Sequence, residues 1–263
     1  MKLSVIIPTR NRANLLHMTL KSIALQTFPI NEFEVIVVDN GSTDNTKQVV
    51  ENFNKDKKNI RYFYDPTPGL HVGRHRGLKE ANAELLVYAD DDIEAFPDWL
   101  EAVWESFQDN EVVLVGGKNL PKWEAEPPYW IYEMWMEINN YGHSLGYLSI
   151  LDFGDEIIEI DPGYVWGCNF SIRKKTLLEA KGFHPDGFPQ DMIKYRGDGE
   201  TSVTNYIQNK KYKTIYNPKA SVYHFVPKNR MTIDYFCKRA FNQGISNSFS
   251  DIRKKLLNDK KNN

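Results

Sequence analysis

The sequence predicts an α/β protein with a central, mostly parallel sheet and helices on both of its faces. Short runs rich in Val and Ile alternate with longer stretches of helical periodicity through the first 120 residues, which is the pattern of parallel strands joined by helices. Polar motifs follow three of these runs, at 8–12, 39–42 and 90–92. Because parallel strands end at one edge of a sheet, we expect these motifs to meet there in a ligand site.

The elements follow one another with few interruptions. The β-branched run 3–7 is closed by Pro8, and the apolar spacing of residues 12–26 completes the first strand–helix unit. In order, we expect strands at 3–7, 34–38, 59–64, 84–89 and 112–115, and helices at 12–26, 43–53, 72–83 and 97–107.

Size and composition indicate a globular protein. With 263 residues, of which 41% are hydrophobic, the chain can bury a sizeable core. A net charge of -2 gives no case for nucleic-acid binding, and Cys168 and Cys237 provide neither a disulfide framework nor zinc spacing. No apolar run is long enough for a signal peptide or a membrane span. We therefore expect a cytoplasmic protein whose contact with a membrane, if it has one, is peripheral.

The buried run 84–89 ends in three acids, Asp90, Asp91 and Asp92. Adjacent carboxylates at the end of a buried strand repel one another unless they share a cation. Oxygen ligands favour Mg²⁺ or Mn²⁺, which usually bridge carboxylates to the phosphates of a substrate. The alternative is an acidic turn that caps the helix expected from residue 97.

Four motifs together resemble family 2 glycosyltransferases of the GT-A fold. They are VIIPTRNR at 5–12, VIVVDNGSTD at 35–44, GRHRG at 73–77 and DDD at 90–92. The resemblance covers about residues 1–120 strongly and 160–225 more loosely. It implies an inverting enzyme that uses a nucleotide sugar and a divalent metal, Mn²⁺ or Mg²⁺. His75 stands where the family usually has Asn, so its role is open.

The same resemblance implies a donor site and a metal site. The donor site comprises Pro8, Thr9, Arg12, Asp39, Arg74, Asp90 and Asp91, and the metal site comprises Asp92, Asp90 and His224. Asp39 meets the base in this assignment, and a carboxylate can accept a hydrogen bond from a uracil imide, which favours a UDP-sugar. Local alternatives are that Asp39 only forms a turn with Ser42, that Arg74 is a solvated helix charge, and that His224 is structural.

Residues 118–163 lose the alternating pattern. Proline, tryptophan and tyrosine crowd this stretch, so we expect an insertion with short helical pieces, including one at 128–138. Most of its aromatic residues are expected in the core, because large aromatic side chains dominate core packing.

The stretches 166–173, 182–183 and 197–201 resemble the acceptor half of the same family. Many relatives have a Glu-Asp pair before a helix, and the second acid deprotonates the acceptor hydroxyl. Here Asp198 and Glu200 are separated by a glycine. Matching the residues that follow places Glu200 on the base, with Asp198 as the alternative. Either acid could instead only cap the helix expected at 201–209, which is followed by strands at 213–216 and 220–225.

We expect one domain with two halves and a tail. Residues 1–120 would bind the nucleotide sugar, 121–226 would bind the acceptor, and 227–263 would form a basic helical tail. The tail has nine Lys or Arg residues and three Asp, a net charge of +6, whereas the rest of the chain is at -8. Basic helices of this kind can lie on an anionic membrane, although a solvated helix face has the same composition. The Lys-rich end is expected to be disordered.

The sequence therefore predicts a metal-dependent inverting glycosyltransferase. It would transfer a sugar from a UDP-sugar to a saccharide or lipid-linked acceptor in surface polysaccharide or glycolipid synthesis. Two other classes stay open: a nucleotide-sugar-binding protein without turnover, which the intact Asp90, Asp92 and Glu200 disfavour, and a nucleotidyltransferase, which would bind a triphosphate.

Overall fold

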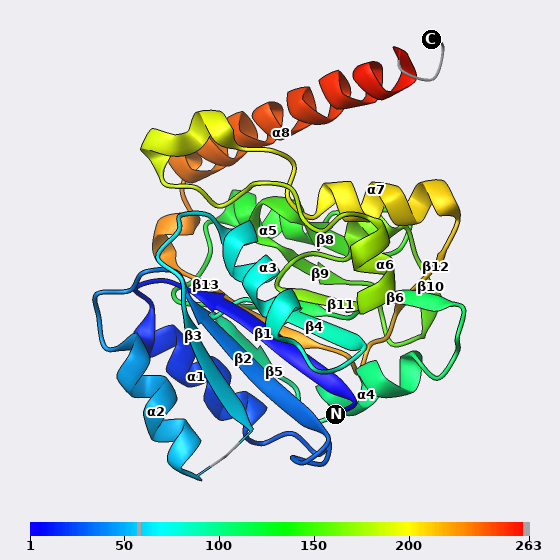
Figure 1. Ribbon diagram of the computed structural model, residues 1–263. Helices are drawn as coiled ribbons and strands as arrows, with labels where there is room; N and C mark the ends of the chain where they lie inside the picture. Colours follow the sequence, from blue (N-terminus) through cyan, green and yellow to red (C-terminus); the bar gives the residue numbers. More distant parts are fainter. Residues whose placement is uncertain (57–58, 260–263) are drawn as a thin grey trace.

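The computed structural model describes residues 1–56 and 59–259 and contains a large central sheet (Figure 1). Its strands are β1 (Leu3–Thr9), β2 (Phe33–Asp39), β3 (Ile60–Tyr64), β4 (Leu85–Ala89), β6 (Val112–Gly116), β10 (Ile158–Glu159), β11 (Asn169–Arg173) and β12 (Lys213–Tyr216). They lie in the order β10-β12-β6-β11-β4-β1-β2-β3.

The first half of this sheet is parallel, as predicted. Strand β1 pairs with β2 and β4, and β2 pairs with β3, so that Ile6 lies between Ile36 and Tyr88. The second half is mixed, because β11 runs antiparallel to both β4 and β6. No strand was predicted at β11, where the buried polar residues Asn169 and Ser171 alternate with apolar ones and interrupt the apolar run.

Helices cover both faces of the sheet. One face carries α1 (Ala13–Ile23), α2 (Thr46–Asp56) and α4 (Trp99–Ser106), and the other carries α3 (Leu70–Glu80), α6 (Lys174–Glu179) and α7 (Thr201–Lys210). Alternate residues of a strand point to opposite faces, so Val5 and Ile7 join the first core and Ile6 joins the second. The predicted arrangement of a sheet between two helical layers is confirmed.

A second sheet of five strands was not predicted. It contains β5 (Ile93–Ala95), β7 (Asn119–Trp123), β8 (His143–Leu145), β9 (Ile150–Asp152) and β13 (Val222–Val226), in the order β5-β13-β7-β9-β8. The expected short helical pieces at 118–163 are present as α5 (Tyr129–Met136) and two 3-10 helices, but the strands β7, β8 and β9 in the same stretch were not predicted. Strands of three to five residues, one of them with an internal proline, give too little periodicity to be read from sequence.

In the described part of the chain, four short 3-10 helices lie between these elements. They are η1 (Gly146–Leu148), η2 (Pro162–Tyr164), η3 (Gln190–Tyr195) and η4 (Lys228–Arg230). The predicted boundary at residues 120–121 falls inside β7, and the one at 226–227 falls at the end of β13.

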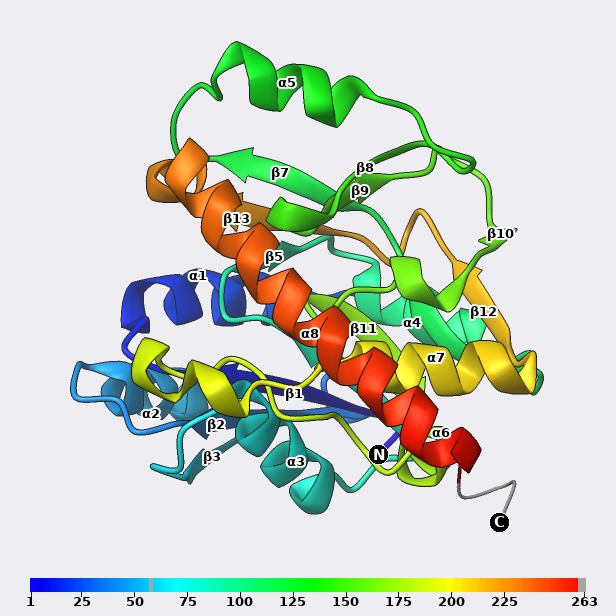
Figure 2. The same cartoon turned by 90° about the horizontal axis from the view of Figure 1, so that it is seen from above.

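The basic tail forms one long helix, α8 (Ile233–Asp259), which crosses one end of the molecule from the region of α5 toward α6 and α7 (Figures 1 and 2). Phe236 of α8 packs in a third core with Ile131 of α5 and Val226 of β13. None of the helices in the described part of the chain has the length and apolar character that crossing a membrane requires. The Lys-rich end expected to be disordered, 260–263, lies outside the described residues.

Candidate active site

The acidic triplet and the first polar motif meet at the edge of the sheet, as predicted. Thr9, at the end of β1, donates a hydrogen bond of 2.6 Å from Oγ1 to Oδ2 of Asp91. The guanidinium of Arg12 bridges two acids, with Nη1 at 2.7 Å from Oδ1 of Asp91 and Nη2 at 2.5 Å from Oδ2 of Asp92. The triplet does not cap the following helix, because β5 separates it from α4.

Burial and neighbouring charges shift the pKa values of the three acids in different directions. Burial, together with the carboxylate of Asp92, raises the pKa of Asp90, and burial raises the pKa of Asp91 to about 7 although Arg12 opposes it. Burial would also raise the pKa of Asp92, but His224, Arg12 and Arg230 outweigh it and lower this pKa. Such carboxylates are the environment in which a shared cation is favoured.

Asp90, Asp92 and His224 offer ligand atoms that all lie within 4.8 Å of one another. His224 Nδ1 donates to the carbonyl of Leu148 at 2.9 Å, so in the neutral ring Nε2 carries a lone pair, and it faces Asp92 Oδ1 at 3.4 Å. This Asp92 oxygen is buried and has no hydrogen-bond partner among the described residues. Two facing acceptors, one of them a buried oxygen without a hydrogen-bond partner, fit a divalent cation. The histidine is oriented through its second nitrogen. The structural alternative for His224 is an ion pair with Asp92 at the same distance.

Arg230 is a site residue that sequence reasoning missed. It lies in η4, and its Nη2 is 3.6 Å from Asp92 Oδ2. In the sequence it was counted only as one charge of the basic tail, because nothing local links it to residue 92.

A cavity of about 290 Å³ lies beside the triplet. Its lining includes Pro8, Thr9, Arg10, Arg12, Asn40, Asp90, Asp91 and Arg230. Residues from the ends of two strands and several guanidinium groups line this cavity, and the candidate cation site lies beside it. These surroundings suit a ligand with phosphate groups.

Asp39 lies at the end of β2 and is buried. It accepts hydrogen bonds from the Ser42 N–H at 2.7 Å and from the Tyr62 hydroxyl at 2.7 Å. The turn with Ser42 considered from the sequence is therefore present. Each carboxylate oxygen can accept a second hydrogen bond, so this turn does not exclude a contact with a base.

Arg74 is not a solvated helix charge, because it is buried. Its Nη1 lies 3.2 Å from Oε2 of Glu200 and 3.6 Å from Oδ2 of Asp186, and its guanidinium carbon lies 5.1 Å from the centre of the Phe183 ring. A side chain at Gly167 would overlap this guanidinium. Burial would lower the pKa of Arg74, but Glu200 and Asp186 raise it, so the arginine stays charged.

A second cavity, of about 210 Å³, contains this arginine. Asp90, Leu70 and Gly187 line both cavities, whereas Arg74 and Glu200 line only the second. Asp90 thus lies at the boundary between the phosphate-type cavity, which is the one that suits phosphate groups, and the second cavity, which contains carboxylates. The partners of Arg74 within the protein are the acids of the second cavity, and its predicted contact with the donor stays a prediction.

Asp186 also lines this cavity and was missed by sequence reasoning. Burial raises its pKa to about 6 although Arg74 opposes this effect. Its Oδ1 is buried and has no hydrogen-bond partner in the described part of the chain. It lies in a loop without periodicity, so only tertiary structure brings it to the site.

The two candidate bases have different surroundings. Glu200 begins α7 but makes no capping hydrogen bond with its side chain. Burial would raise its pKa, and Arg74 lowers it. Asp198 is bound by His184 at one oxygen and by the Ser250 hydroxyl at the other, so both its oxygens are occupied by protein groups.

His75 has a structural contact. Its Nε2 accepts the N–H of Phe183 at 3.0 Å, and burial lowers its pKa. This hydrogen bond ties α3 to the loop that carries Asp186, and it answers the question that the sequence left open for this position.

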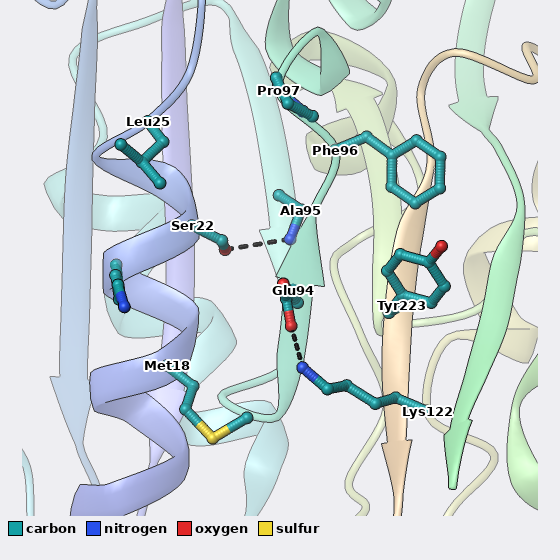
Figure 3. A pocket seen from close by; sticks show the side chains of 10 residues that line it. Met18, Ser22, Leu25, Glu94, Ala95, Phe96, Pro97, Lys122 and Tyr223 are labelled. Carbon is teal, nitrogen blue, oxygen red and sulfur yellow. Dashed lines mark hydrogen bonds and ion pairs between the residues drawn. The ribbon is translucent and has the colours of Figure 1, made fainter.

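A larger cavity, of about 550 Å³, lies between α1, β5 and β13 and contains none of the predicted site residues (Figure 3). Met18, Leu25, Phe96 and Tyr223 are among its lining residues, and Glu94 and Lys122, which also line it, form an ion pair. The site is therefore defined by its chemistry and not by the size of the cavity.

Residues 4–177 match the family model described as glycosyl transferase family 2. The chain belongs to this family. It is a glycosyltransferase, as predicted, and not the nucleotidyltransferase that the sequence left open. The matched residues include the acidic triplet and Arg74, whereas Glu200 and His224 lie beyond them.

Two curated relatives cover most of this glycosyltransferase. It is 26% identical to the glucosyl-dolichyl phosphate glucuronosyltransferase of Haloferax volcanii, over 100% of this chain and 81% of the relative. It is 29% identical to the GalNAc(5)-diNAcBac-PP-undecaprenol beta-1,3-glucosyltransferase of Campylobacter jejuni, over 88% of this chain and 67% of the relative.

Solved structures share the GT-A fold with this glycosyltransferase. The mannosyltransferase PcManGT from Pyrobaculum calidifontis, in complex with GDP-Man and Mn²⁺, has a TM-score of 0.61 and 22% identity, covering 86% of this chain. TarS 1–349 of S. aureus, in complex with UDP, has a TM-score of 0.59 and 21% identity, covering 91% of this chain. This chain spans 57% and 63% of those two chains.

Proposed function

We propose that this glycosyltransferase moves a sugar from a nucleotide sugar, with a divalent cation, to a hydroxyl of a lipid-linked or polysaccharide acceptor, with inversion at the sugar carbon. The observation that carries the proposal is the position of Asp90, which borders both the phosphate-type cavity and the cavity of Glu200. A donor in the first cavity and an acceptor in the second would meet at this residue.

The donor would lie in the cavity beside the triplet. Arg12 and Arg230 would face its diphosphate, with Asp90, Asp92 and His224 as the cation ligands. When bound, a cation neutralises the negative charge that develops on the departing diphosphate. We propose that the donor is a UDP-sugar, because the carboxylate of Asp39 can accept a hydrogen bond from a uracil imide. We propose that the cation is Mn²⁺ or Mg²⁺. The Pyrobaculum neighbour is in complex with Mn²⁺ and GDP-Man, and the TarS neighbour is in complex with UDP.

Glu200 would take the proton from the acceptor hydroxyl. Inversion needs a base on the side of the sugar opposite the leaving group, and Glu200 lies in the other cavity from the proposed diphosphate site. Arg74 keeps this carboxylate ionised and fixes its direction, which makes Arg74 a positioning residue. Asp198 is the weaker candidate, because its two oxygens bind His184 and Ser250.

We propose a lipid-linked acceptor and contact with an anionic membrane through α8. The names of the two curated relatives specify dolichyl phosphate and undecaprenol. Phe241, Ile252 and Leu256 are exposed on α8, and Lys238 and Lys255 lie beside them on the same side of the helix. Exposed apolar side chains among lysines are typical of helices that lie on anionic lipid surfaces. These features support our proposal that the enzyme works at the cytoplasmic face of a membrane.

A screen of nucleotide sugars for hydrolysis in the absence of acceptor tests the donor part of the proposal. Purified enzyme would be incubated with UDP- and GDP-sugars in Mn²⁺, in Mg²⁺ and in EDTA. We expect hydrolysis of at least one UDP-sugar that EDTA abolishes. Turnover of GDP-sugars alone would overturn the UDP assignment, and turnover that persists in EDTA would overturn the metal assignment.

A further inference from the structure

Between residues 239 and 250, the side of α8 that faces the domain is mainly polar, whereas Phe236, about one turn earlier, packs in the third core. Ser246 Oγ donates to the carbonyl of Gly197 at 3.0 Å and accepts from Arg196 Nε at 3.2 Å, and Ser250 binds Asp198. Residues 239, 243, 246 and 250 recur at helical spacing, so they share this face. A helix that served only to cover the core would present apolar side chains here.

This polar face forms a wall of the proposed acceptor cavity. Arg239, Gln243 and Ser246 line the cavity of about 210 Å³ that also contains Asp90 and Glu200. Figure 2 shows α8 lying across the end of the molecule in the direction of α7, the helix that Glu200 begins. The tail therefore contributes side chains to the place where the acceptor would bind.

The arginines of this cavity differ in their partners. Arg74 is matched by Glu200 and Asp186. Within residues 1–56 and 59–259, neither Arg196 nor Arg239 forms an ion pair with a carboxylate, and Arg239 Nε is buried without a hydrogen-bond partner. A buried N–H without a partner is uncommon and calls for a group that completes it.

Most carboxylates of the cavity already contact other groups, and the exception is Oδ1 of Asp186, which is buried without a hydrogen-bond partner among the described residues. Asp198 binds His184 and Ser250, Glu200 binds Arg74, and Asp90 belongs to the possible cation site. Asp186 contacts Arg74, and the charge of Arg196 also lowers the pKa of Asp186. Among the described residues, Arg196 Nε has Ser246 as a partner, whereas Arg239 has neither an ion pair nor a partner for its buried Nε.

We propose that Arg239, assisted by Arg196, binds an oxyanion of the acceptor in this cavity. The inference rests on the proposed function and deepens it: the acceptor carries an acidic group, a phosphate or a sugar carboxylate, close to the sugar that is extended. The planar fork of arginine binds either oxyanion through paired hydrogen bonds. Because one small cavity holds both Glu200 and Arg239, the acidic group lies near the reacting hydroxyl and not far along a neutral polymer.

Binding of small probes tests the site without requiring turnover. The affinities of glucose 1-phosphate, glucuronic acid and methyl glucoside would be measured by ligand-observed NMR, in EDTA to suppress cation-dependent binding at the donor site. Arg239→Gln removes the charge, Arg239→Lys keeps the charge but removes the fork, and Lys238→Gln is the matched control on the exposed side of the same helix.

We expect at least one acidic probe to bind the wild-type enzyme and Lys238→Gln at least about tenfold more tightly than methyl glucoside. Arg239→Gln should remove that preference, and Arg239→Lys should lie between. Preference for glucose 1-phosphate identifies a phosphate, and preference for glucuronic acid identifies a carboxylate. Absence of a preference in the wild type, or an equal preference in Arg239→Gln, overturns the proposal.

The same enzyme preparations separate this inference from the proposed function. If the wild type hydrolyses a nucleotide sugar but shows no arginine-dependent preference for acidic probes, the oxyanion site alone is wrong. If the preference depends on Arg239 but no nucleotide sugar is turned over, the proposed function is wrong and the oxyanion site stands.

Discussion

Arg74 on α3 and Glu200 at the start of α7 lie 3.2 Å apart, from Nη1 to Oε2, although 126 residues separate them in the sequence. The pair connects the half of the molecule that carries the acidic triplet with the half that carries the proposed base. A buried arginine in this position determines both the charge and the direction of the carboxylate, so it affects how the enzyme responds to pH.

Replacing Arg74 should change the pH dependence of transfer. Arg74 lowers the pKa of Glu200 against the effect of burial, so the wild-type base stays ionised into the acid range. In Arg74→Gln the pKa of Glu200 rises, and the acid limb of the profile of kcat against pH should move to higher pH. The profile would be measured from about pH 4 to about pH 9, a range that includes the pKa values of free carboxylates and histidine. An unshifted acid limb in an active variant would contradict this role.

Glu200→Gln should abolish most transfer while donor binding persists. The amide keeps the shape of the side chain but cannot accept the acceptor proton at neutral pH, so kcat should fall by about a hundredfold or more. Transfer would be measured by product formation, and the affinity for UDP by calorimetry.

Asp198→Asn is the comparison for this prediction. Its carboxylate holds His184 and Ser250, so we expect a smaller loss of kcat and a loosened α8, seen as faster amide hydrogen exchange around residue 250. A loss of transfer in Asp198→Asn alone would exchange the two assignments.

Asp92→Asn should remove the dependence of donor binding on the cation. The substitution keeps the hydrogen-bonding shape toward Arg12 but takes away the charge of one proposed ligand. Calorimetric titration of UDP would show an affinity that Mn²⁺ raises in the wild type and no longer raises in the variant. Glu94→Gln, two residues along the chain and paired with Lys122 outside the site, is the matched control and should behave as the wild type. The same Mn²⁺ response in Asp92→Asn would remove this residue from the cation site.

Glu34→Gln should destabilise the first half of the sheet in a pH-dependent way. Glu34 is buried and accepts hydrogen bonds from Ser4 at 2.7 Å, from Arg61 at 2.8 Å and from the Asn82 N–H at 2.7 Å. At pH 7 the free energy of unfolding should fall by about 1–3 kcal/mol. Urea unfolding of both proteins would provide the comparison.

The sign of the pH dependence follows from the Glu34 pKa. Burial would raise this pKa, but the hydrogen bonds from Asn82, Ser4 and Arg61 lower it below 4.5 in the folded protein. The stabilisation is therefore fully present above the unfolded pKa and is lost as the pH falls through the folded pKa. The difference between wild type and variant should shrink below about pH 4.5. Glu32→Gln, at a surface pair with Lys2, should cost under about 1 kcal/mol at any pH.

Local patterns in the sequence determined the first half of the molecule. The strand runs, the helical spacing and the turn residues are encoded within about ten neighbours each, and parallel topology then brings their carboxyl ends to one edge. Thr9, Arg12 and the acids 90–92 therefore came together as predicted. The strand at 220–225 was predicted, but the rest of the second sheet escaped prediction because its strands are only three to five residues long.

Only the tertiary structure decided what each charged residue faces. The sequence left Arg74 as either a donor contact or a solvated helix charge and gave no sign of its contact with Glu200, because that contact depends on how α3 and α7 approach each other. Arg230 beside Asp92, Asp186 in the acceptor cavity and Arg239 on the inner side of α8 have no local signal at all. Their positions result from the packing of loops and a terminal helix onto the sheet, and contacts of this kind depend on the whole fold rather than on periodicity.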